Sequence, residues 1–164
     1  MTSLRELRPD DAPALQLIYS EPSVRHLPRP AMTAASAAAW LTSCMAEQQA
    51  ASRTSHCFGI THDDDLIGVI KLRTDGTTAA LSYILRPDTW GHGHATTAVT
   101  LMLDHATTTL HLTSVTAKHH PENHASARVL VRAGFTCTGH SATAVTYERP
   151  LCVTELGSST ARTG

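Results

Sequence analysis

The sequence predicts one α+β domain with a mixed, mostly antiparallel sheet of six to seven strands, flanked by about four helices. Three observations support this. Turn signals at 62–65 and 75–76 join apolar runs into an antiparallel meander. An apolar run at 81–85 then leads through a glycine-containing turn into an amphipathic segment, the pattern of a strand followed by a helix. Two short runs at 136–137 and 144–148 predict a closing hairpin.

Length and composition limit the class of protein. The 164 residues can bury roughly 70% of their unfolded surface around a single core. We expect residues 1–151 to form one domain and the polar residues 152–164 to form a flexible tail. The 13 basic and 14 acidic residues nearly cancel, which argues against binding to nucleic acid or to a membrane surface. No apolar run is long enough for a signal peptide or a membrane span, so we expect a cytoplasmic protein.

The N-terminal third predicts one strand and two helices. Apolar and charged residues alternate from Leu4 to Arg8, as in a strand. Asp10 or Asp11 should cap the first helix, which ends before Glu21 and offers to the core Leu15, Leu17 and Ile18. Thr33 should cap the second helix, whose apolar side carries Ala37, Trp40, Leu41, Cys44 and Met45.

Three strands follow, at 55–61, 66–73 and 77–85. The turn between the first two contains the aspartates 63–65, which could suggest a metal site. No fourth carboxylate stands at a calcium-loop spacing, so a solvated hairpin tip is the better interpretation.

The turn from Trp90 to Ala95 is the most informative stretch. The first amides of a helix lack intrahelical acceptors, the helix dipole is positive there, and glycines allow a ligand to approach the main chain. Gly91 and Gly93 therefore predict a phosphate-binding turn. It is not a dinucleotide fingerprint, because Thr96 stands at the third glycine position, and no P-loop lysine follows.

The last third predicts a strand that is marked by Leu112, Val115 and Ala117 and ends at residues 118–120. A helix capped by Asn123 follows and ends at Gly134. Phe135 should then pack back on the last turn of that helix.

Two motifs together resemble one family. The chain reads Trp-Gly-His-Gly-His-Ala at 90–95 and Pro-Glu-Asn-His-Ala-Ser at 121–126, followed by Gly134-Phe135. This is similar to the GNAT superfamily of N-acetyltransferases, and to its RimJ/RimL-like branch, whose members read W-G-x-G-x-A and P-x-N-x-x-S. The resemblance extends from Leu4 to Leu151.

The resemblance implies an N-acetyltransferase that moves the acetyl group of acetyl-CoA to a primary amine by direct attack in a ternary complex, without a metal. The acceptor would be a protein N-terminus or a small amino metabolite or antibiotic, and the protein a monomer or homodimer. The central strand would splay from its neighbour beside a bulge. The implied cofactor-binding residues are Ile84, Leu85, Trp90, Gly91, His92, Gly93, His94, Ala95, Thr96, Asn123 and Ser126.

The catalytic residues depart from the family pattern. The usual tyrosine acid is replaced by Leu130, so the resemblance points to Ser126 as the donor to the leaving group. The usual glutamates are also absent, since Thr97 stands at one position and residues 78–83 hold no carboxylate. Histidine at the following strand end offers a base instead, either His119 or His120. A metal held by His92, His94 and one of these histidines would need a further carboxylate.

Other interpretations remain open at this stage. The donor could be a pantetheine thioester on an acyl carrier protein, or the domain could bind acyl-CoA without catalysis. In the loop after the first helix, Arg25, His26 and Arg29 would either touch the substrate or be ordinary solvated charges.

Overall fold

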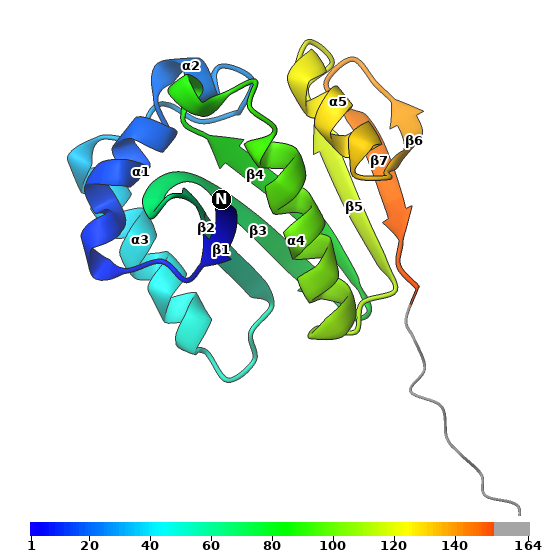
Figure 1. Cartoon of the computed structure of the whole chain (residues 1–164), viewed down its shortest axis with the longest axis horizontal. Coiled ribbons are helices and arrows are strands. Elements are labelled where there is room, and N and C mark those ends of the chain that lie inside the picture. The colour runs from blue at the N-terminus through cyan, green and yellow to red at the C-terminus, as the bar shows by residue number, and fades with distance from the viewer. Residues whose placement is uncertain (153–164) are drawn as a thin grey trace, which may run out of the picture.

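The computed structural model describes residues 1–152, and these form one seven-stranded mixed sheet (Figure 1). The strand order is β1-β2-β3-β4-β5-β7-β6, and every neighbouring pair is antiparallel except β4 and β5. The strands are β1 (Thr2–Arg5), β2 (Ser55–His62), β3 (Asp65–Asp75), β4 (Thr78–Leu85), β5 (Ser114–His119), β6 (Thr136–His140) and β7 (Val145–Pro150). The predicted α+β fold class is therefore confirmed.

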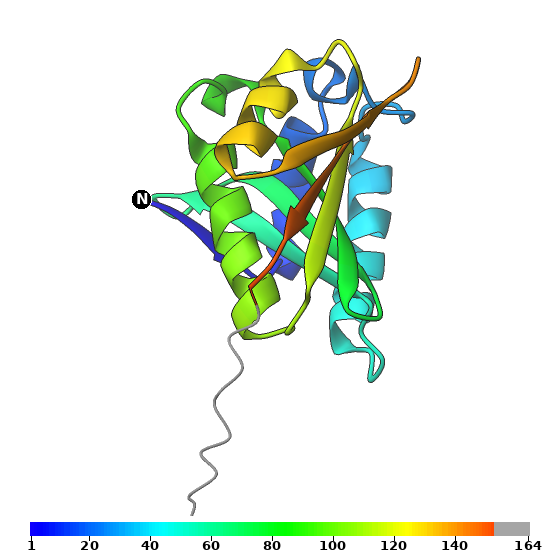
Figure 2. The same ribbon diagram turned by 90° about the vertical axis from the view of Figure 1, so that its right-hand side faces the viewer.

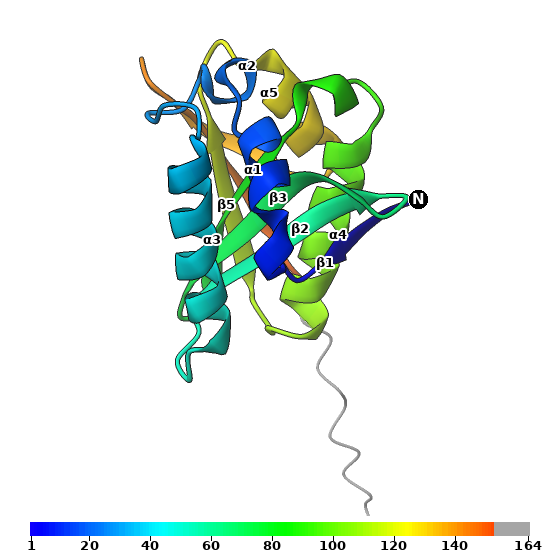
Figure 3. The same cartoon turned by 90° about the vertical axis from the view of Figure 1, so that its left-hand side faces the viewer.

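Helices cover both faces of the sheet. The described residues form α1 (Ala12–Ile18), α2 (Glu21–Val24), α3 (Ala34–Gln49), α4 (His94–Thr108) and α5 (His124–Arg132). The side views show α1 and α3 on one face and α4 and α5 on the other (Figures 2 and 3). One hydrophobic cluster lies under each layer, so the strands between them are buried on both sides.

Several predicted local features are confirmed. Thr33 caps α3 by accepting a hydrogen bond from the Ser36 amide, and Asn123 caps α5 by accepting one from the Ser126 amide. Gly134 has a φ of +87°, and Phe135 is buried behind it. The β2–β3 hairpin turns at Asp63 and Asp64, both in the left-handed region, and Asp63 pairs with the N-terminal amine at 2.6 Å.

The N-terminal segment differs from the prediction. The first strand is Thr2–Arg5 rather than Leu4–Arg8, because Leu7 leaves the sheet edge to join the cluster under α1 and α3. Leu17 was expected in the core but is 57% exposed, since the short α1 turns only Leu15 and Ile18 fully inward. The segment expected to stop the first helix forms a helical turn of its own, α2.

Asp11 precedes α1 but does not cap it through its side chain. Its carboxylate accepts hydrogen bonds from the Arg5 guanidinium at 2.9 and 2.8 Å and from the Arg8 amide at 2.7 Å. Asp11 therefore ties β1 to the segment that leads into α1.

The expected tail at 152–164 lies, apart from Cys152, outside the described residues. Within residues 1–152, no helix has the combination of length and apolar character needed to cross a bilayer.

The Arg5–Asp11 pair predicts a pH-dependent contribution to stability. Burial alone would raise the pKa of Asp11, but the hydrogen bonds from Arg5 and Arg8 outweigh burial and hold the pKa below its usual value. We expect Asp11→Asn to lower the free energy of unfolding at pH 7 by about 2 kcal/mol, because charge-assisted hydrogen bonds are lost. Since the stabilisation requires the carboxylate, the difference should shrink as pH falls below about 3.9. Urea unfolding of both proteins at pH 7 and at pH 3 measures it, and a pH-independent difference would contradict this role.

Candidate functional site

The site begins where β4 and β5 stop pairing. Their parallel ladder covers only four pairs, from Thr78–Ser114 to Leu81–Ala117, while β4 continues to Leu85. β5 instead pairs along its whole length with β7. The second half of β4 therefore has β3 on one side and an opening on the other.

The hydrogen-bond pattern shows which main-chain groups face this opening. The Arg86 amide donates to the Ile67 carbonyl of β3 at 2.8 Å. Main-chain groups alternate along an antiparallel strand, so those of Ile84 also face β3, and those of Tyr83 and Leu85 face the opening. The β3–β4 register runs unbroken from Gly68–Leu85 to Asp75–Thr78, so the bulge expected in this strand is absent.

A cleft of about 470 Å³ occupies the opening. Its walls are α2 with the loop after it, the end of β4, the glycine turn (residues 90–93) with the start of α4, and one side of α5. Most of the cofactor-binding residues implied by the resemblance line it: Ile84, Leu85, Trp90, Gly91, Gly93, His94, Ala95, Thr96, Asn123 and Ser126. His92 lies in the same turn but is not among the lining residues.

The glycine turn presents free amides to the cleft. Gly91 and Gly93 have φ values of +79° and +80°, a backbone conformation that side chains disfavour. The first helical hydrogen bond of α4 runs from the Thr97 amide to the Gly93 carbonyl. The preceding amides at 94–96 have no intrahelical acceptor and lie at the positive end of the helix dipole, as an anion site requires.

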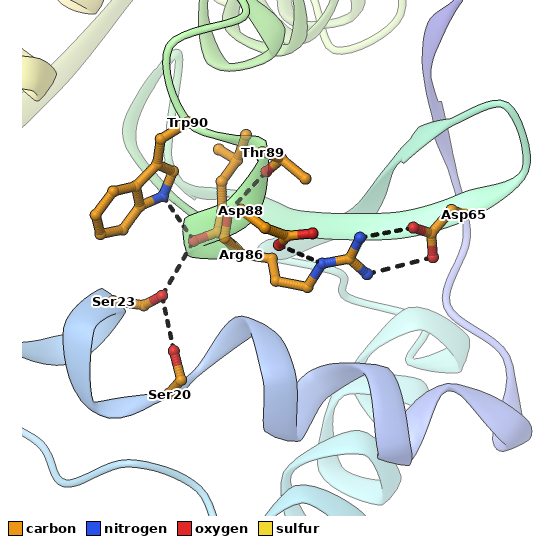
Figure 4. Close-up of polar contacts among 8 residues, drawn as sticks. Ser20, Ser23, Asp65, Arg86, Asp88, Thr89 and Trp90 are labelled. Carbon is orange, nitrogen blue, oxygen red and sulfur yellow. Dashed lines mark hydrogen bonds and ion pairs between the residues drawn. The ribbon is translucent and has the colours of Figure 1, made fainter.

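The carbonyl of Leu85 anchors this wall. It accepts hydrogen bonds from the Trp90 indole at 3.0 Å and from the Ser23 hydroxyl at 3.1 Å (Figure 4). Next to it, the Arg86 guanidinium bridges Asp65 and Asp88, at 2.7 and 2.6 Å. These contacts fix the glycine turn and α2 to the end of β4. The Leu85 amide, which faces the opening, remains available as a donor.

Two hydroxyls lie on the opposite walls. Ser126 stands in the first turn of α5, and Tyr83 projects from β4. The Tyr83 hydroxyl oxygen is buried and has no hydrogen-bond partner. Burial raises the pKa of Tyr83 to about 12, although the neighbouring Ser126 opposes the rise. Sequence reasoning missed Tyr83; the only signal was a polar aromatic residue near the end of an apolar strand.

The two histidines proposed as a base have different surroundings. His119 is 8% exposed, and both its ring nitrogens are engaged: Nδ1 with the His120 carbonyl at 2.7 Å and Nε2 with the Tyr147 hydroxyl at 3.0 Å. It does not line the cleft. The His120 ring accepts a hydrogen bond from the Glu122 amide at 3.2 Å and stacks on His26, with ring centroids 5.1 Å apart.

His26 is the histidine that the structure places in the cleft on the acceptor side. Burial lowers its pKa, and nearby Arg25 and His120 lower it further. The imidazole is therefore neutral at neutral pH, as a proton acceptor must be.

His26, His120 and Glu122 also bring potential ligand atoms within 4.8 Å of one another. A metal must lie near the plane of each coordinating imidazole, whereas these two rings are stacked at an interplanar angle of 16°. One nitrogen of each ring already receives a hydrogen bond, from Arg25 and from the Glu122 amide. The geometry thus fits a stacked imidazole pair better than a metal centre.

A second group of histidines borders the glycine turn. His94 bonds through Nδ1 to the Thr2 hydroxyl at 2.8 Å, and its ring lies 4.5 Å from that of His62 and 6.0 Å from that of His92. Burial and these two rings lower the pKa of His94. His94 therefore flanks the anion site as a neutral imidazole fixed to β1.

Residues 2–136 match the family model described as the acetyltransferase (GNAT) domain. No curated protein matches the sequence. Among solved structures, RimJ of Mycobacterium smegmatis in complex with CoA-disulfide is 24% identical, with a TM-score of 0.77 over 91% of this chain and 81% of that one. RimL, the ribosomal L7/L12 α-N-protein acetyltransferase in complex with coenzyme A, is 17% identical, with a TM-score of 0.80 over 93% and 95%.

Spermidine N-acetyltransferase of Vibrio cholerae, in complex with CoA and spermine, is 17% identical, with a TM-score of 0.76 over 91% of this chain and 95% of that one. At these identities, the solved structures establish a common fold.

Proposed function

Since the chain belongs to the GNAT acetyltransferase family, we propose that it transfers the acetyl group of acetyl-CoA to a primary amine by direct attack in a ternary complex. The observation that carries this proposal is the cleft between β4 and β5, because it joins a free strand edge to the amides of a helix N-terminus. A thioester on a long polar arm that ends in phosphates needs both features. Acetyl-CoA would be used without a metal, in the cytoplasm.

The donor would lie along the cleft from α4 to β4. The amides at 91–96 would hold the pyrophosphate, with up to about 2 kcal/mol from the helix dipole. Arg128 and Arg132 line the cleft across from this turn, one helical turn apart on α5, and would contact the remaining phosphate charge. The pantetheine arm would bond to the carbonyl of Tyr83 and to the free side-chain NH₂ of Asn123. The solved structures of RimJ, RimL and the spermidine enzyme contain CoA, which supports acetyl-CoA as the donor.

The chemical step would occur at the end of β4. Attack by the amine places negative charge on the thioester oxygen, and the Leu85 amide is a fixed donor for that charge. Ser126 would donate to the departing sulfur. We assign the base to His26, supported by His120, rather than to His119, because His26 lines the cleft and both nitrogens of His119 are engaged.

The charged residues that line the cleft limit which amines could be the acceptor. Among the described residues, its charged lining consists of three guanidiniums, those of Arg25, Arg128 and Arg132, and one carboxylate, that of Glu122. A polycation such as spermidine would meet too few carboxylates to compensate its charge. We therefore favour a protein N-terminus or a small amine with a single positive charge.

Thr78–Leu85 holds no carboxylate that could act as the base. This favours a second candidate function, an acyl-CoA-binding module without catalysis. Calorimetric titration with acetyl-CoA, followed by a CoA-release assay against peptides and monoamines, separates the two. Binding with release supports the transferase, and binding without release across the panel supports the module. No binding at millimolar acetyl-CoA would contradict both. A large preference for acyl carrier protein thioesters over acyl-CoA would identify a carrier-protein donor instead.

If the pyrophosphate binds at the glycine turn, an alanine in this turn should weaken CoA binding, whereas an alanine at a similar glycine elsewhere should not. Gly93→Ala should weaken CoA binding roughly tenfold, because relief of the left-handed backbone strain would turn the free amides away from the pyrophosphate. Gly76→Ala is the matched control, since Gly76 also has a positive φ and open space around its Cα but lies in the β3–β4 hairpin, at the other end of β4. Calorimetry should show normal affinity for this control. Equal affinity in both variants would place the phosphates elsewhere.

The His26 assignment predicts the pH profile. Because its pKa is lowered, kcat/KM should fall only below about pH 6.5, where the base becomes protonated. His26→Ala should remove this fall in kcat/KM. His120→Ala should move the fall to higher pH, because the His120 imidazole no longer lowers the pKa of His26. His119→Ala should lower the melting temperature but leave the pH dependence of kcat/KM unchanged. If His26→Ala retains the wild-type profile, the base assignment is wrong.

A further inference from the structure

The hydroxyl of Tyr83 lies in the wall of the cleft, where it is buried and has no hydrogen-bond partner. A buried hydroxyl without a partner destabilises a protein, because its lost hydration is not compensated, so such a group calls for an explanation. The buried Tyr147 offers the contrast, because its hydroxyl is bonded to His119 on the strand pair away from the cleft. The unsatisfied phenol lies where β4 leaves β5, beside the first turn of α5.

Ser126 faces the same point. Its amide is used by the Asn123 cap, but its hydroxyl makes no hydrogen bond within residues 1–152. The two hydroxyls are close enough for hydrogen bonding to Ser126 to lower the pKa of Tyr83, although their geometry falls short of a formed hydrogen bond. A strand residue and a helix residue thus bring two unused donors to one end of the free strand edge.

We propose that Tyr83 and Ser126 act together on the leaving sulfur, with the Tyr83 hydroxyl donating to Ser126 Oγ and the Ser126 hydroxyl donating to the sulfur. This inference rests on the proposed acetyl transfer. When the tetrahedral intermediate collapses, the carbon–sulfur bond breaks and its electron pair moves to the sulfur. The thiolate leaves hydrogen-bonded to Ser126, and the proton released by the amine passes to the base and then to solvent. Tyr83 acts through Ser126, so it is a positioning residue.

The surroundings of both residues fit this role. Tyr83 remains a donor across the physiological pH range, because burial keeps its pKa far above neutrality. Leu130, at the position of the tyrosine acid in many relatives, is 1% exposed and apolar, so α5 provides no phenol. The phenol comes instead from β4, on the opposite wall.

Tyr83→Phe removes only the hydroxyl and tests the pair. It should raise the melting temperature, because an unsatisfied buried group is lost. It should also lower kcat about tenfold with little change in the KM for acetyl-CoA, as expected for a donor that matters when charge develops on the sulfur. Tyr147→Phe is the matched control; it should lower the melting temperature, since His119 loses its partner, and keep kcat.

A second readout needs no acceptor. Ultraviolet absorbance of the thiolate measures the pKa of the CoA thiol in its complex with the protein. Tyr83→Phe should raise this pKa by about one, which corresponds to the same tenfold effect. In a Ser126→Ala background, Tyr83→Phe should have no further effect on the thiol pKa or on kcat, because its contact with the sulfur runs through Ser126.

The outcomes separate this inference from the proposed function. If CoA binds and the thiol pKa and kcat of Tyr83→Phe equal those of the wild type, the donor pair is overturned while the transferase stands. If Tyr83→Phe has the same effect in the wild type and in the Ser126→Ala background, the donor pair is also overturned, because Tyr83 would then act independently of Ser126. If the wild-type protein does not bind CoA, the proposed function fails and the inference fails with it.

Discussion

The site depends on the end of the parallel ladder at Leu81 and Ala117. β4 stays paired with β3 up to Leu85, and β5 stays paired with β7 up to His119. Two antiparallel pairings thus pull the parallel neighbours apart, in a sheet whose strands also twist relative to one another. Gly68 contributes to this divergence on the β3 side. A Cβ at Gly68 would lie 2.6 Å from the Ile84 carbonyl oxygen, so only glycine permits so close an approach.

Contacts at the end of β4 keep the opening between β4 and β5 in place. The contacts of Trp90 and Ser23 with the Leu85 carbonyl satisfy one of the main-chain groups that face the opening. The bridge from Arg86 to Asp65 and Asp88 holds the turn that follows. The glycine turn, α2 and the strand end are therefore connected through the Leu85 carbonyl, and these contacts hold the amides of α4 and of Leu85 at the same cleft. Preorganised donors of this kind stabilise developing charge without reorganisation at the moment of reaction.

The sequence predicted those parts of the fold that depend on local chemistry. The Thr33 cap, the left-handed Gly134 and the strands from Ser55 to Leu85 follow from capping rules, turn residues and apolar runs. The family resemblance drew attention to the glycine turn, which lines the cleft. Features set by tertiary contacts were missed. The pairing of β1 with β2 decides where the first strand ends, and the shortness of α1 leaves Leu17 in solvent. The role that we propose for Tyr83 depends on an unsatisfied hydroxyl. His119 and His26 differ through contacts with Tyr147 and His120, respectively, which are distant in the sequence. No local pattern encodes these contacts.

Hydrogen–deuterium exchange with and without acetyl-CoA tests the central claim, that the divergence of β4 from β5 forms the donor site. Saturating acetyl-CoA should slow exchange in peptides that contain Tyr83–Leu85, Gly91–Thr96 and Asn123–Ser126, while the β3–β4 hairpin at Asp75–Thr78, at the other end of β4, exchanges as before. Protection confined to other segments, with the amides of Leu85 and of the glycine turn unchanged, would contradict the claim.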